Sequence, residues 1–254
     1  MKLPLLSLCF ALLALASCGP DKKTARLSGK IEGLDQAALL IYPADAVEGD
    51  GGSLDSIKVN RGSFSYDRPT TVPLLLTLVY PNNSFTTIIA QPGKEVTLSG
   101  DANRLKEMEV VGTDENKQFT EFRLSVLKLS EKDAQMRAAT YIRTHPESWT
   151  SVALLYHYFD RVASRSEQPT LSLLDLLKKH QPTNQQLSAI DARLRPQVRT
   201  AIGGFLPNFT ATTLSQQTLR SADFKGQPTL LIFSASWDSH NYYLRQQLRK
   251  LKSA

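Results

Sequence analysis

The sequence predicts an α+β protein with several modules: an N-terminal antiparallel β-sandwich or barrel-like domain, a helical middle region and a partial βα unit at the C-terminus. Short segments of alternating apolar and polar residues, separated by turn formers, fill the chain as far as Val111, which is typical of antiparallel sheets. After Gly112 the apolar spacing becomes helical. Near the C-terminus, a continuous apolar run from Thr229 to Phe233 suits a buried parallel strand.

The N-terminus has the three parts of a secretory signal peptide: a positive charge at Lys2, an uncharged apolar run and small residues before Cys18. The run is shorter than the roughly 20 apolar residues that span a bilayer. Leu15-Ala16-Ser17-Cys18 resembles a lipobox, in which the cysteine thiol receives a diacylglyceryl group. We therefore expect residues 1–17 to be a cleaved lipoprotein signal, Cys18 to carry lipid such as palmitate, and residues 18–25 to be a polar tether. An ordinary signal peptide or an anchor helix is the alternative.

Cysteine usage limits the chemistry of the remaining chain. The sequence has two cysteines, Cys9 inside the predicted signal and Cys18 at the predicted lipid site. Once Cys9 is removed and Cys18 is modified, no free thiol remains. The mature protein is then expected to lack an intramolecular disulfide, a thiolate nucleophile and a zinc site with cysteine ligands.

Residues 26–112 are expected to form the β-rich domain. Two hairpins are predicted, because each pair of apolar segments is separated by a short polar turn such as Asn60-Arg61-Gly62. A loop is expected between Asp45 and Ser53, where glycine and acidic residues gather. The expected strands are Leu27–Ile31, Ala38–Tyr42, Ser56–Val59, Ser63–Tyr66, Leu74–Tyr80, Phe85–Ala90 and Glu95–Ser99.

Residues 113–203 are expected to form the helical region. Thr113-Asp114-Glu115 is a plausible helix start, and apolar residues follow it at helical spacing. Further helices are expected at residues 131–143, 148–162, 171–179 and 184–194. The breaks between these helices are expected at or near four prolines, Pro146, Pro169, Pro182 and Pro196.

The C-terminal segment, residues 204–254, reads Leu206-Pro207-Asn208-Phe209, then Leu214, then Ala222 to Pro228, then Leu230 to Trp237. In order and spacing these residues resemble the start of thioredoxin-like domains of the peroxiredoxin (AhpC/TSA) and thiol–disulfide reductase kind. The family places its two redox cysteines where this chain has Asp238 and Asn241. A carboxylate and an amide cannot perform thiol–disulfide exchange. We therefore expect no catalytic residue here, with Asp238 acting as the N-cap of a helix at Tyr242–Leu251.

The resemblance also covers only about one βα unit of the family's fold, without its later strands and proline loop. An incomplete, degenerate thioredoxin-like domain is therefore expected at residues 204–254. The whole order of lipobox, β module, helices and C-terminal unit resembles the Bacteroidetes lipoproteins that carry a DUF4369-type domain ahead of a thioredoxin-like domain. That resemblance implies a cell-envelope location, and the residues after Cys18 favour the periplasmic face.

These observations predict a lipid-anchored envelope protein of the binding or interaction type, with the membrane and an unknown protein or small ligand as partners. The alternative is a thiol–disulfide oxidoreductase of which this chain is a truncated or variant copy. Nucleic acid is not expected, because the modest charge of +6 is scattered rather than gathered in a stripe. No cofactor or metal is expected, because no metal-binding or nucleotide-binding motif occurs. Packing or helix-end roles are expected for His145, His157, His180 and His240.

Overall fold

The computed structural model describes residues 23–46, 54–162, 167–200, 202–235, 237–238 and 240–252. Cys18 and the predicted signal peptide lie outside these residues, as do most residues of the loop expected between Asp45 and Ser53. The chain divides into two compact units, Met1–Gly204 and Phe205–Ala254.

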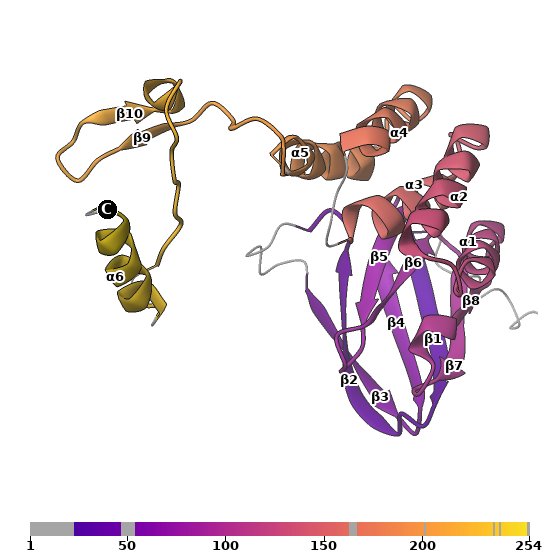
Figure 1. The fold of residues 1–254 in the computed structure, drawn as a ribbon. Helices are drawn as coiled ribbons and strands as arrows, with labels where there is room; N and C mark the ends of the chain where they lie inside the picture. Colours follow the sequence, from indigo (N-terminus) through magenta and orange to yellow (C-terminus); the bar gives the residue numbers. More distant parts are fainter. Residues whose placement is uncertain are drawn as a thin grey trace, which may run out of the picture. The chain divides into compact units, whose positions relative to one another are not determined.

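The first unit contains one eight-stranded sheet with the strand order β6-β5-β2-β3-β4-β1-β7-β8 (Figure 1). The sheet curls into a nearly closed barrel rather than a two-sheet sandwich. Its pairs are antiparallel except β1 with β7, which run parallel, so the purely antiparallel prediction was wrong on this point. The reason is topological, since β7 follows two hairpins and returns beside β1. The strands are β1 (Thr24–Glu32), β2 (Gln36–Pro43), β3 (Asp55–Asn60), β4 (Ser63–Pro69), β5 (Leu74–Val79), β6 (Phe85–Ala90), β7 (Glu95–Asp101) and β8 (Glu109–Val111).

The predicted hairpin of β3 and β4 is confirmed. Asn60 pairs with Ser63, and the two residues between them, Arg61 and Gly62, have φ angles of 50° and 75°. Positive φ at both positions is the two-residue turn whose twist matches that of paired strands. A Cβ on Gly62 would lie 2.7 Å from the backbone oxygen of Ile31, so glycine also permits the close approach of β1.

Alternate side chains of the strands fill the barrel interior. Tyr80, the largest of them, is 2% exposed, and its hydroxyl lies 2.8 Å from the Thr86 hydroxyl inside the barrel. The other members are apolar, so the interior is a packed core. This core contains Ala25, Leu27, Ile31, Leu39, Ile41, Ile57, Val59, Phe64, Leu76, Leu78, Ile88, Ala90, Val96, Leu98, Met108 and Val110.

Helix α1 (Asp114–Ser125) contacts both edge strands of the sheet, β6 and β8. Its N-cap is Thr113, whose hydroxyl accepts a hydrogen bond from the Asn116 N–H. The Asn116 side chain accepts from the Ile89 N–H at 2.9 Å and donates to the Ile89 carbonyl at 2.7 Å. One helical turn later, the Thr120 hydroxyl makes the same pair of bonds with the backbone of Val110. Two polar side chains on one helix face thus replace the missing strand partners.

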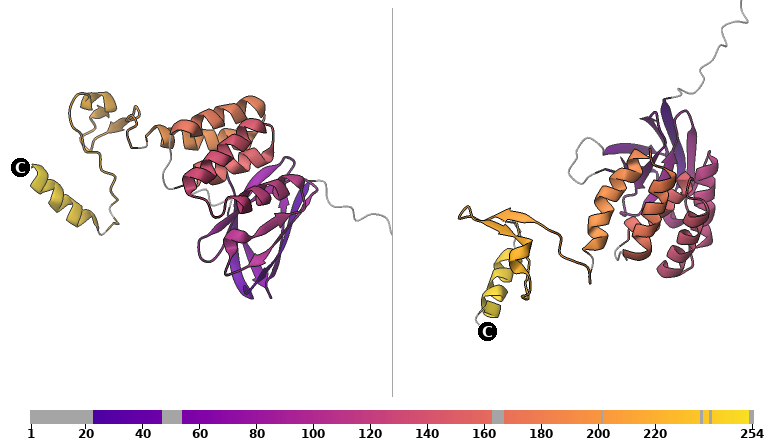
Figure 2. Two further views of the ribbon diagram at one scale, coloured as in Figure 1. Left: turned by 45° about the vertical axis from the view of Figure 1, so that its right-hand side comes forward. Right: turned by 90° about the horizontal axis from the view of Figure 1, so that it is seen from above.

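A layer of helices packs against one side of the barrel (Figure 2). A second apolar core forms between these helices and the outer side of β5 and β6. The layer contains α2 (Glu131–Thr144), α3 (Trp149–Leu155), the π-helical turn η2 (Tyr156–Asp160), α4 (Glu167–His180) and α5 (Gln185–Arg199). Leu75 and Ile89 belong to this core although they lie on strands. The Gln186 side chain accepts from the Leu75 N–H and donates to the Leu75 carbonyl, which ties α5 to β5.

Two helix boundaries differ from the prediction. The single helix expected at residues 148–162 is α3 followed by η2, a change of hydrogen-bond pattern that apolar spacing does not reveal. Pro196 was expected to end a helix but lies inside α5. Proline removes one hydrogen bond there, and the burial of Leu194 and Val198 on either side supports the continuation.

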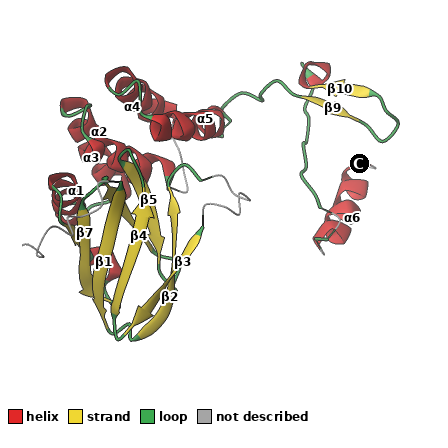
Figure 3. Ribbon diagram, turned by 180° about the vertical axis from the view of Figure 1, so that it is seen from behind, coloured by secondary structure: helices red, strands yellow, loops and turns green. Residues whose placement is uncertain are grey.

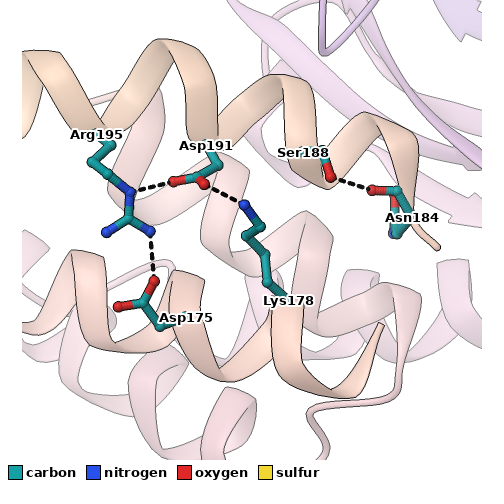
Figure 4. Close-up of polar contacts among 6 residues, drawn as sticks. All are labelled: Asp175, Lys178, Asn184, Ser188, Asp191 and Arg195. Atoms are coloured by element: carbon teal, nitrogen blue, oxygen red, sulfur yellow. Dashed lines mark hydrogen bonds and ion pairs between the residues drawn. The ribbon is translucent and has the colours of Figure 1, made fainter. Parts of the chain in front are cut away.

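Ion pairs connect α4 with α5 (Figure 4). Arg195 donates to Asp175 at 2.5 Å and to Asp191 at 2.7 Å, and Lys178 also binds Asp191. Burial acts to raise the pKa of Asp191, but the hydrogen bonds from Lys178 and Arg195 outweigh it and lower that pKa.

None of the described residues of the second unit belongs to either apolar core. This unit contains a hairpin of β9 (Thr210–Thr212) and β10 (Thr218–Arg220), the turn η3 (Ser221–Phe224) and helix α6 (His240–Lys252). The buried strand expected at Thr229–Phe233 is absent, and Leu230 and Phe233 are 69% and 89% exposed. An apolar run becomes a buried strand only with partner strands, and no strand pairs with these residues.

Candidate functional site

A groove of about 410 Å³ lies at the end of the barrel where the parallel strands β1 and β7 finish. Its walls come from β1, β7, the 3-10 turn η1 (Leu105–Glu107) and the start of β8. Six of the eight lining residues are ionisable. The lining consists of Lys30, Glu32, Ser99, Gly100, Asp101, Arg104, Glu107 and Glu109.

Carboxylates outnumber cations in this groove. Arg104 contacts Glu107 at 3.3 Å and Asp101 at 3.9 Å, so two of the four carboxylates share its single positive charge. Lys30 is the other cation of the lining, which also contains the carboxylates of Glu32 and Glu109. The groove therefore carries a net negative charge and favours a ligand that contributes a positive group.

Helix α1 hydrogen-bonds to the segment from Arg104 to Glu109, which forms one wall of the groove. The Arg123 guanidinium donates to the backbone carbonyls of Lys106 and Met108. Gly100 allows the same segment to fold closely over β7, because a Cβ there would lie 2.3 Å from the Met108 sulfur. The positions of Glu107 and Glu109 in the groove thus depend on α1 and on a glycine in β7.

Arg123 is itself a buried cation, and burial lowers its pKa. No carboxylate pairs with it among the described residues, and its Nε has no hydrogen-bond acceptor. Burial also raises the pKa of Tyr80 to about 12, so this nearby hydroxyl stays neutral. The two backbone carbonyls therefore provide the main compensation for the buried charge.

A second polar group lies among aromatic rings at the π-helical turn. The His157 ring packs 5.2 Å from the Phe85 ring and 5.8 Å from the Phe119 ring. Burial, followed by the positive charges of Arg123 and Arg161, lowers the pKa of His157 to about 4. His157 is therefore neutral at pH 7 and serves packing, as the aromatic pattern around it predicts.

The residues singled out in the C-terminal unit lie close together in sequence and structure. The Asp238 N–H donates to the Ala235 carbonyl at 3.1 Å, and the Asn241 N–H donates to the Asp238 carbonyl at 3.2 Å. The Asn241 side chain also donates to the Ala235 carbonyl. Helix α6 begins at His240, two residues after Asp238. Cys18, the predicted lipid site, is outside the described residues.

Membrane spans and metal clusters are both absent from the described ranges. No helix in them is both long and apolar enough to cross a bilayer. Likewise, in this part of the chain no three His, Cys, Asp or Glu side chains gather as a metal ion would require.

The fold and the groove define a barrel-like β domain that a helix closes. Residues 25–119 match the family described as "Domain of unknown function (DUF4369)". The match runs from β1 to Phe119 in α1, so it includes the eight strands and the closing residue Asn116. A DUF4369 domain at residues 25–119 therefore confirms that part of the expected resemblance. No curated protein and no solved structure matches the chain.

The groove was missed in the sequence. Of its charged residues, Lys30, Glu32 and Asp101 lie at outward positions of β1 and β7, where alternation normally places solvated side chains. The parallel pairing of β1 with β7, which brings Lys30 beside Ser99, joins residues that are far apart in the chain. Only the closeness of Asp101, Arg104, Glu107 and Glu109 in sequence offered a signal.

Proposed function

We propose that this protein is a lipid-anchored cell-envelope protein that binds a partner rather than catalysing a reaction, with the lipid on Cys18 and the folded part facing the periplasm. The observation that carries the proposal is the pattern Leu15-Ala16-Ser17-Cys18 directly after an uncharged apolar run. Lys23, the first described residue, follows Cys18 by five positions, so the anchor and the DUF4369 domain are joined by a short tether.

The groove at the ends of β1 and β7 is the binding site in this proposal. Its exposed charges suit a polar ligand or a protein segment with a positive group. The barrel interior is instead filled by a packed apolar core, in which the hydroxyls of Tyr80 and Thr86 hydrogen-bond to each other. A ligand would therefore contact the outer end of the barrel.

The redox alternative requires a nucleophilic thiol that this chain does not supply outside Cys9 and Cys18. An insulin-reduction assay on the mature protein tests this alternative. We expect no reduction above the rate of dithiothreitol alone. Measurable turnover would show that the protein is an oxidoreductase and overturn the binding proposal.

Lipid attachment is tested by Cys18→Ala, with Cys9→Ala as the matched control inside the same predicted signal. Cells are fed labelled palmitate and then separated into soluble and membrane fractions. We expect Cys18→Ala to lose the label and the membrane retention, and Cys9→Ala to keep both. Unchanged labelling of Cys18→Ala removes the claim of an anchor.

Binding at the groove is tested by placing a photo-crosslinking amino acid at Ser99 or, as a control, at Ser65. Both serines are exposed outward positions on strands, but only Ser99 lines the groove. We expect a discrete crosslinked product in irradiated cells from position 99 and none from position 65. Equal products from both positions, or none from either, contradict a partner at the groove.

A further inference from the structure

The chain enters the barrel between two loops. The Thr70 N–H donates to the Lys23 carbonyl at 2.8 Å, and the Gly93 N–H donates to the Thr24 carbonyl at 2.9 Å. The loop after β4, residues 70–73, and the turn after β6, residues 91–94, therefore flank the point at which the tether joins the fold. We call these two loops the entry loops.

The tether is too short to hold the entry loops far from a membrane. Lys23 lies five positions after Cys18 in the sequence. A chain of that length spans at most about 18 Å when it is fully extended, and less in any other conformation. If Cys18 carries lipid in the bilayer, Lys23 and the entry loops bonded to it lie within about that distance of the lipid headgroups.

The entry loops present side chains that suit the headgroup layer. Val72 is an exposed apolar residue, with 59% of its surface accessible. Lys94, at the end of the other loop, is also exposed. Both signs of charge occur around them, since Arg26 pairs with Asp67 and Lys94 is followed directly by Glu95. The lipid anchor would supply the attraction, and this surface meets the bilayer without strong repulsion.

The groove lies at the opposite end of the same strands. Lys30 is six residues beyond Thr24 along β1, a distance of about 20 Å at the usual rise of a strand. The β3–β4 turn lies at that end too, since Ser63 pairs with Lys30. The uncovered outer face of β1, β4 and β3 runs between the two ends (Figure 3).

From this geometry we infer that the entry loops form a bilayer-facing surface, with Val72 at the headgroup level, and that the charged groove faces away from the membrane. This inference rests on the proposed lipid anchor and adds the orientation of the domain. The occupant of the surface is a phospholipid bilayer, because the tether length places one there.

The orientation is tested on the full lipidated chain reconstituted into phosphatidylethanolamine–phosphatidylglycerol vesicles. Val72→Cys and, as the control at the far end, Ser63→Cys are each labelled with an environment-sensitive fluorophore. Both positions are exposed. The introduced thiol is the only free one, since Cys9 is removed and Cys18 is modified. Flotation with the vesicles first establishes that the protein is anchored.

We expect headgroup spin labels to quench the fluorophore at position 72 at least twofold more than the one at position 63. Equal quenching of an anchored protein, or stronger quenching at position 63, overturns the orientation and leaves the anchor intact. Failure to float shows instead that the proposed lipid anchor is wrong, and the orientation falls with it.

Discussion

The two units of this chain contain similar apolar segments and bury them very differently. Leu75 and Leu76 in β5 are at most 1% exposed, whereas Leu230 and Leu231 are 69% and 49% exposed. Strand β5 pairs on both sides, with β2 and β6, and the helices cover its outer face. Residues 229–233 pair with no strand in the part of the chain that the structure describes. The comparison shows that an apolar run is stabilised by the partners that the rest of the chain provides.

The largest expected effect compares one residue type in the two units. Phe119→Ala removes a fully buried ring from the helical core, which costs about 3–5 kcal/mol. Phe233→Ala removes a ring that is 89% exposed and should change the free energy of unfolding by about 0.5 kcal/mol or less. Urea unfolding followed by Trp149 fluorescence in a Trp237→Phe background measures the effect of Phe119→Ala. Urea unfolding followed by far-UV circular dichroism, which reports on the whole chain, measures the effect of Phe233→Ala.

A large loss of stability from Phe233→Ala would contradict the difference in burial between the two units. It would mean that the C-terminal unit buries this ring in solution. The background variant alone serves as the reference for both measurements.

The next effect tests how α1 closes the barrel. Asn116→Leu removes both hydrogen bonds to the backbone of Ile89 and leaves a buried N–H and carbonyl without partners. We expect a loss of about 2–4 kcal/mol in the free energy of unfolding. Lys117→Leu, the matched substitution at the neighbouring exposed position, should have little effect. Similar losses from both variants would contradict closure by Asn116.

The closure by Asn116 also shows where prediction from the sequence stops. Alternation, short apolar runs and turn residues predicted seven of the strands, and Thr113 marked the start of α1, because these signals are local. The bonds from Asn116 to Ile89 and from Gln186 to Leu75 join residues 27 and 111 positions apart, and no local pattern encodes them. The short strand β8 depends on the same long-range contacts, since it pairs with β7 and is held by Thr120.

The same distinction between local and long-range signals applies to Cys18 and the groove. The proposed lipid site at Cys18 rests on a local sequence pattern, whereas the groove exists only once β1 and β7 pair in parallel. The resemblance of residues 206–237 to thioredoxin-like domains stays a prediction. The exposed run at residues 229–233 shows that a local pattern alone does not form a buried strand.

A smaller effect depends on pH. The pKa of His157 is about 4 in the folded protein and near 6.5 in an unfolded chain. Between these values the unfolded state binds a proton that the folded state does not, so stability falls as pH falls from 6.5 towards 4. By pH 5 this contribution is about 1–2 kcal/mol, given that the ring is only partly buried.

His157→Phe keeps an aromatic ring beside Phe85 and Phe119 and removes the titrating group. We expect its stability to fall less than that of the original protein between pH 6.5 and pH 5, as measured by urea unfolding at each pH. His145→Gln, at an exposed helix end, is the control. An unchanged pH dependence in His157→Phe would exclude this histidine as the acid-sensitive group.

The smallest effect concerns the ion pairs between α4 and α5. Arg195→Met keeps the apolar stem and removes the bonds to Asp175 and Asp191, which should cost about 1 kcal/mol because the guanidinium is only partly buried. Without Arg195 the pKa of Asp191 should rise towards its ordinary value. Because its folded pKa is lowered, Asp191 contributes stability above its unfolded pKa, and this contribution is lost as pH falls through the folded pKa. Arg195→Met should therefore lose less of its free energy of unfolding in acid than the original protein does.

Arg199→Met on the same helix is the matched control, because Arg199 is exposed and forms no ion pair in the described structure. High salt should reduce the stability difference between the original protein and Arg195→Met and leave that of Arg199→Met unchanged, since screening acts on the ion pairs. Unfolding midpoints in low and high salt measure both differences. If the two arginine variants respond alike, the α4–α5 contact depends on its apolar core, with Leu174, Leu177 and Leu187, rather than on these charges.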